Sequence, residues 1–78
     1  MLVELITPEE KLFEGEISSI KLPGKTGEFE ILNNHAPIVS TLIKGDIRII
    51  NKVKKTETFS INGGVVEMQN NKIIVLVD

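Results

Sequence analysis

The sequence contains no cysteine, tryptophan or tyrosine, and it has one histidine and three phenylalanines among 78 residues. Without cysteine the chain can form neither a disulfide nor a thiolate metal site, and His35 alone cannot make a multi-histidine site. Three aromatic side chains are too few to build a platform on which nucleic-acid bases stack. The absences argue against a disulfide-stabilised fold, a zinc protein and a binder of single-stranded nucleic acid.

Positive charge and long apolar runs are also scarce. The 9 basic and 11 acidic residues give a net charge of −2, which is the wrong sign for a protein that neutralises phosphates. No apolar run approaches the ~20 residues that a membrane-spanning helix needs. With 78 residues, the chain is predicted to form a single domain, residues 1–78, around a thin core.

The apolar residues that are present are mostly β-branched. Ile and Val together number 19 and Leu 7, whereas Ala36 is the only alanine. β-branched side chains suit a pleated sheet, while a helical domain favours alanine and leucine. The sequence therefore predicts an all-β fold, a flattened β-sandwich of about eight to ten short, mostly antiparallel strands.

Alternation of apolar and polar residues predicts the individual strands. They are expected at residues 2–6, 28–31, 38–43, 46–50, 56–61, 65–69 and 73–77, and residues 13–22 are expected to form one or two strands. A bulge at Gly15 or at Ser18 and Ser19 would correct a change of parity in the second strand. Turns are predicted at residues 23–27, 33–37, 52–55, 62–64 and 70–71. The last strand is apolar on both faces, which predicts a central strand buried on both sides.

Few residues are suited to chemistry. His35 is the only proton shuttle for neutral pH, but no nucleophile motif accompanies it, so a loop histidine that binds a partner is favoured. Glu28 and Glu30 project from one face of a predicted strand and could bind a cation, but a solvated sheet face is the simpler explanation. We predict no catalytic residue, no cofactor and no metal ligand.

Two other functions remain open on these patterns alone. Lys72 follows a predicted hairpin turn, as does the modified lysine of small all-β biotinyl and lipoyl carrier domains. Its neighbours Asn71 and Ile73 do not match the Met-Lys-Met or Asp-Lys signatures of those carriers. The lysines of residues 52–55 could contact nucleic acid, but a solvated hairpin tip is favoured because Glu57 follows closely and no aromatic residue is interleaved.

Residues 27–37 read Gly-Glu-Phe-Glu-Ile-Leu-Asn-Asn-His-Ala-Pro. This segment resembles the epsilon subunit of the F-type ATP synthase, called delta in mitochondria, in which Gly-Glu-Phe/Leu-Gly-Ile-Leu runs into Asn/Gly-His-Ala-Pro. Residues 7–15, 44–49, 62–67 and 75–78 resemble further segments of that family, in the same order. Glu30 and Asn33 depart from it, since the family often has glycine and proline at these positions.

The resemblance implies a non-catalytic subunit of the central stalk that couples the membrane c-ring to the gamma subunit during ion-driven ATP synthesis. It implies a peripheral location on the cytoplasmic face of the bacterial inner membrane, without direct membrane insertion and without nucleic acid or cofactor. Most bacterial relatives continue into a two-helix hairpin, for which residues 1–78 have no counterpart. We therefore expect the β-sandwich domain alone.

The resemblance also assigns contact residues. Glu28, with Gly27 and Phe29, matches the acidic contact to the c-ring, whose loop commonly carries arginine and so offers a charge-assisted hydrogen bond. The segment that faces the gamma subunit corresponds to His35, Ala36, Pro37, Ile38 and Ser40.

Overall fold

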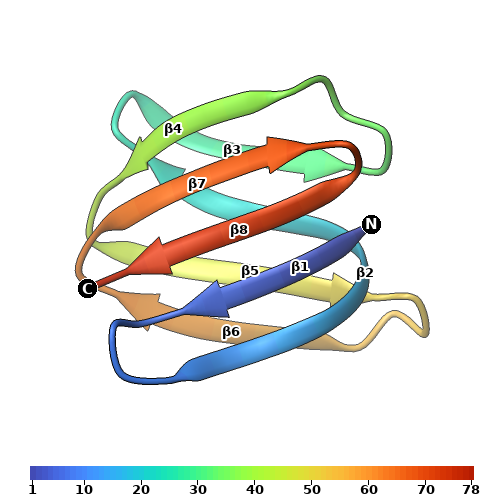
Figure 1. Cartoon of the computed structure of the whole chain (residues 1–78), viewed down its shortest axis with the longest axis horizontal. Coiled ribbons are helices and arrows are strands. Elements are labelled where there is room, and N and C mark those ends of the chain that lie inside the picture. Colours follow the sequence, from blue (N-terminus) through green and yellow to red (C-terminus); the bar gives the residue numbers. More distant parts are fainter.

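A computed structural model describes all 78 residues, which form eight β-strands and no helix (Figure 1). The strands are β1 (Leu2–Ile6), β2 (Lys11–Gly24), β3 (Gly27–Leu32), β4 (Ile38–Leu42), β5 (Gly45–Asn51), β6 (Thr56–Ile61), β7 (Gly64–Gln69) and β8 (Lys72–Val77). The all-β prediction is confirmed. Since the chain has no helical segment, none of it forms a helix that could span a membrane.

The strands form one sheet that folds over to make two layers. Their order is β1-β8-β7-β4-β2-β5-β6, with β3 paired to β2 and a further pairing of β1 with β2. Every pair is antiparallel except β1 with β8. In Figure 1, β1, β8, β7 and β4 form the front layer, with β3, β5 and β6 behind them. The extents of 27 × 24 × 18 Å describe a flattened sandwich.

The core lies between the layers and consists of 16 buried apolar residues, most of them Ile, Leu and Val. Alternate side chains of each strand point into it, because successive residues of a strand face opposite sides. Thus Val3 and Leu5 of β1 are fully buried, and so are Ile20 and Leu22 of β2. The β-branched composition therefore reflects the filling of a narrow space between two pleated surfaces.

The long second strand contains the predicted bulge. Ile17 is opposite Asn51 of β5 and Ser19 is opposite Ile50, so Ser18 has no partner residue of its own. One extra residue reverses the parity of the strand. As a result Ile17 and Ile20 both point into the core although they are an odd number of residues apart.

The predicted loop at residues 23–27 is wrong in extent. β2 runs to Gly24 and β3 begins at Gly27, so the turn itself is only Lys25 and Thr26. The strands approach closely here: a Cβ on Gly24 would lie 2.7 Å from the Gly27 carbonyl oxygen and 2.8 Å from the Phe29 ring. Glycine therefore permits this close pairing, which its general preference for loops does not predict.

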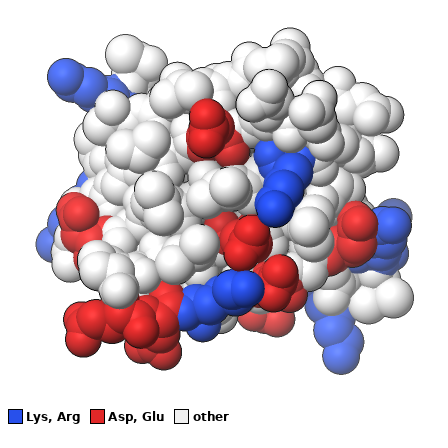
Figure 2. Space-filling view, in the orientation of Figure 1, with Lys and Arg blue, Asp and Glu red and all other residues white.

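The prediction that the last strand is buried on both sides is also wrong. β8 is central in the sheet, between β1 and β7, but only its inner face is covered. Ile73, Val75 and Val77 are buried, whereas Leu76 is 54% exposed. This front layer faces the viewer in Figure 2, and its upper half is mostly uncharged. No second layer covers it, so the apolar outer side chains remain available to a partner.

Candidate partner-binding surfaces

The first predicted contact lies at the end of the sandwich where β3 begins. Gly27 has a φ of +136°, and an added Cβ there would meet no atom within 4 Å. Glu28 is exposed and takes part in no ion pair of the chain. Phe29 is half-buried and packs against the core. The start of β3 therefore offers Gly27 and Glu28 to a partner, while Phe29 anchors it to the core.

The second predicted contact begins at the opposite end of β3, in the loop that leads to β4. His35, Ala36 and Pro37 are all exposed. The His35 amide donates to the Leu32 carbonyl at 3.2 Å. The Nδ1 atom of His35 lies 2.7 Å from the Ala36 carbonyl oxygen. These local contacts shape the loop and leave its outer surface free.

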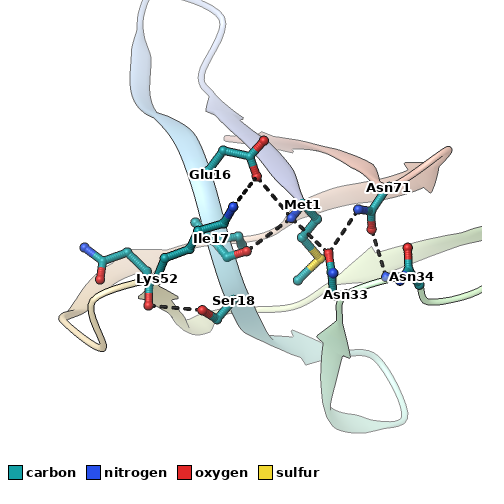
Figure 3. A network of polar contacts seen from close by, with 9 residues as sticks. Met1, Glu16, Ile17, Ser18, Asn33, Asn34, Lys52 and Asn71 are labelled. Atoms are coloured by element: carbon teal, nitrogen blue, oxygen red, sulfur yellow. Dashed lines mark hydrogen bonds and ion pairs between the residues drawn. The ribbon is translucent and has the colours of Figure 1, made fainter.

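A network of polar contacts fixes the same loop (Figure 3). Asn71, in the turn between β7 and β8, donates from Nδ2 to Asn33 Oδ1 at 3.0 Å and accepts from the Asn34 amide at 2.8 Å. The Met1 amine donates to the same Asn33 oxygen at 3.0 Å and lies 3.2 Å from Glu16 Oε2. Asn33 therefore joins the start of β1, the loop and the β7–β8 turn.

The remaining residues assigned to the gamma contact lie on β4. Ile38 and Ser40 are half-buried and share the side of the strand on which Leu42 is buried. Val39 points the other way and is 71% exposed. The exposed loop residues 35–37 thus continue into Val39, which lies within the segment 36–40 that the resemblance assigns to the gamma contact.

Val39 belongs to a larger surface, which we call the outer face. It is formed by outward side chains of β1, β8, β7 and β4, namely Glu4, Ile6, Val39, Val65, Glu67, Ile74 and Leu76. Of these, Val65 is 43% exposed and Leu76 54%. A hollow of about 310 Å³ on this face is lined by Ile6, Val65 and Leu76 among others. The only signal for it in the sequence is the apolar run of the last strand, a pattern that predicts burial on both faces.

Charged side chains are paired along the lower part of this face. Glu4 lies 3.3 Å from Lys11 Nζ and 3.4 Å from Lys72 Nζ, and Lys11 also contacts Glu14 at 2.9 Å. The hydrogen bond from Lys11 is the main cause that lowers the pKa of Glu4, with a further contribution from Lys72 against the opposing effect of desolvation. Hydrogen bonds to Glu14 and then Glu4 raise the pKa of Lys11.

Comparison with known proteins decides the family. The family model described as the β-sandwich domain of the ATP synthase delta/epsilon chain matches residues 1–78. The chain belongs to this family. Membership confirms the resemblance found in the sequence and the prediction of a non-catalytic ATP synthase subunit.

Bacterial relatives in the family are similar along almost the whole chain. The ATP synthase epsilon chain of Leptospira interrogans is 45% identical and that of Campylobacter concisus 40% identical, each over 97% of this chain and 59% of the relative. The epsilon chain of Chlorobaculum tepidum is 37% identical over 86% of its own length. This epsilon-family chain thus spans 59% of the length of the first two relatives.

Solved structures agree with the family. A chain of the Euglena gracilis mitochondrial ATP synthase superposes with a TM-score of 0.90 at 19% identity, covering 96% of this chain and 48% of the other, which shows the fold. A chain in the central stalk and c-ring structure of the Tetrahymena thermophila mitochondrial ATP synthase gives 0.79 at 25% identity, covering 97% and 61%. The carrier hypothesis has no such support, and Lys72 is engaged with Glu4.

Proposed function

We propose that this epsilon-family domain is part of the central stalk of a rotary ATP synthase and couples the c-ring to the gamma subunit. The family match over residues 1–78 carries this proposal. A similar chain belongs to the central stalk and c-ring structure of the Tetrahymena enzyme. The domain would work on the cytoplasmic face of the bacterial inner membrane, held there by the complex.

The arrangement of the predicted contacts supports a coupling role. Glu28 lies at the start of β3 and His35 lies just beyond its end, so a partner at each would be joined by one continuous strand. Behind that strand, Ile31 is fully buried and pairs with Ile20 of β2. A packed, hydrogen-bonded sandwich resists deformation, so it can pass torque between two bodies that it contacts.

The c-ring contact is assigned to Glu28, with Gly27 beginning β3 directly after the turn and Phe29 packed against the core. An exposed carboxylate without an internal cation is free to accept from an arginine of a c-ring loop. The gamma contact is assigned to the loop residues His35, Ala36 and Pro37 and to the following strand, where Ile38 and Ser40 support the exposed Val39.

The assignment is tested by Glu28→Lys in a complete ATP synthase assembled with this chain. We expect ATP-driven ion translocation per ATP hydrolysed to fall, because the substitution places a cation opposite the arginine of the ring. Glu30→Lys is the matched control: it makes the same charge change two residues further along the same strand. Full coupling in the Glu28→Lys enzyme would overturn the c-ring assignment.

A further inference from the structure

The outer face carries one carboxylate that the chain leaves without a cation. Glu67 is exposed in the middle of β7 and stands in register between Val39 of β4 and Ile74 of β8. It takes part in none of the ion pairs of the chain. Glu4, which also lies on this face, is by contrast bound by both Lys11 and Lys72.

The surroundings of Glu67 are shaped to receive side chains. A hollow of about 320 Å³ on one side is lined by Pro37, Val39 and Glu67 among others. A second hollow of about 270 Å³ on the other side is lined by Glu67, Lys72 and Ile74 among others. Glu67 belongs to both, so a side chain that enters either hollow meets its carboxylate. The first hollow also continues the loop assigned to the gamma contact, because Pro37 lies in both.

Glu67 constrains the chemistry of whatever covers this face. A purely apolar partner would remove water from the carboxylate without replacing its hydrogen bonds, and burial of an unpaired charge is strongly unfavourable. A partner with one cation set between apolar side chains would satisfy both Glu67 and its neighbours Val39, Val65 and Leu76. The face therefore discriminates between partners as well as attracting them.

We propose that Glu67 is a specificity-determining residue of the gamma interface and accepts hydrogen bonds from a lysine or arginine of the gamma subunit. The cation enters beside Glu67 while apolar gamma side chains cover Val39 and Leu76. This inference rests on the proposed function, which supplies the partner. A second copy of the chain fits poorly, because a two-fold contact centred on Glu67 would place two carboxylates together.

Affinity for the isolated gamma subunit of the same ATP synthase tests the proposal. Calorimetric titration would compare the unsubstituted chain with Glu67→Lys, Glu67→Gln and the control Glu30→Lys, which changes an exposed carboxylate on β3, outside the outer face. We expect Glu67→Lys to weaken binding by at least about tenfold and Glu67→Gln by roughly threefold to tenfold. Glu30→Lys should bind as the unsubstituted chain does. Thermal unfolding would confirm that each variant is folded.

Salt and self-association complete the test. The affinity of the unsubstituted chain should fall with rising salt more steeply than that of Glu67→Gln, which lacks the charge. Unchanged gamma affinity in Glu67→Lys would overturn this inference and leave the proposed function standing. Failure of the unsubstituted chain to bind gamma would overturn the proposed function as well. If the unsubstituted chain forms a dimer and Glu67→Lys changes the strength of that dimer, the face binds a second copy of the chain. That outcome would also overturn the inference.

Discussion

At the scale of single residues, Glu4 shows how charge is managed on the outer face. Its side chain is 18% exposed and lies between two lysines. The hydrogen bond from Lys11 is the main reason why the pKa of Glu4 lies below the ordinary value of 4.5. The unfolded chain therefore binds this proton at a higher pH than the folded chain does, and the contact stabilises the fold only while Glu4 is ionised.

The first prediction concerns the acid side of stability. The contribution of Glu4 is complete above the ordinary glutamate pKa and is lost as the pH falls through the lower, folded-state value. We expect Glu4→Gln to be less stable than the unsubstituted chain at neutral pH and to lose less stability between about pH 5 and pH 3. Urea unfolding at a series of pH values measures this difference.

One control variant makes that test specific. Glu57→Gln removes an exposed carboxylate that has no ion-pair partner, so its pH profile should follow that of the unsubstituted chain. At high pH, the raised pKa of Lys11 gives its stability contribution the opposite pH dependence to that of Glu4. Its contribution is present below the ordinary lysine value and is lost as the pH rises through the folded-state value. If the unfolding free energy falls equally between about pH 5 and pH 3 in the unsubstituted chain, Glu4→Gln and Glu57→Gln, the role given to Glu4 is contradicted.

At the scale of elements, the turn between β7 and β8 supports the loop between β3 and β4. Asn70 and Asn71 both have positive φ, +54° and +59°, as a two-residue hairpin turn of type I′ requires. The same Asn71 holds Asn33 and Asn34 with its side-chain amide. One residue therefore both closes a hairpin and fixes the neighbouring loop.

The second prediction separates these two roles of Asn71. Asn71→Gly keeps the positive φ but removes the amide, so only the contacts to the loop are lost. We expect a loss of about 1–3 kcal/mol in unfolding free energy, since two hydrogen bonds disappear. Amide hydrogen exchange should quicken at Asn34 and His35. Unchanged exchange in the loop would show that Asn71 does not hold it.

The elements also show what the sequence could predict. The eight strands, the bulge at Ser18 and the Asn70–Asn71 turn all follow from local parity and turn chemistry. The short turn after Gly24 does not, because the strand pairing of Gly24 with Gly27 runs against the preference of glycine for loops. The open face of β8 does not either, because it depends on what packs against the sheet. Periodicity records that a residue is apolar, but whether a second layer covers it is decided by tertiary packing.

The site residues divide in the same way. The exposure of Glu28 and His35 agrees with their places on the polar side of a predicted strand and in a loop. On β4, Val39 points outward and Ser40 points toward the core. Which of the two is exposed depends on how β4 is paired with β7. Asn33 departs from the proline common in the family, and the structure gives its amide oxygen two donors, Asn71 and the Met1 amine. That use of the side chain has no signal in local sequence.

At the scale of the whole molecule, stability depends on a small core. A domain of 78 residues is expected to have an unfolding free energy of about 4–12 kcal/mol. Ile20 is fully buried and lies between Ile31 of β3 and Ile49 of β5 in the strand register. Its side chain therefore contributes to the packing of three strands at once.

The third prediction follows from this packing. Ile20→Ala should lower the unfolding free energy by about 2–5 kcal/mol, and Ile20→Val by about 0.5–1.5 kcal/mol. Leu32→Ala should cost much less, because Leu32 is 55% exposed on the outside of β3. Chemical denaturation gives all three values. Equal losses for Ile20→Ala and Leu32→Ala would contradict the core described here.

The parallel pairing of the first and last strands also governs how the protein is made. Leu2 lies opposite Lys72 and Ile6 opposite Leu76, so the partners are 70 residues apart along the chain. A ribosome that adds about 5–20 residues per second needs roughly 4–14 s to supply this spacing. During that time β1 can rest only on β2, and its other edge stays unpaired. We therefore expect the nascent chain to be most prone to aggregation just before β8 emerges, and to become protected in one step when it does.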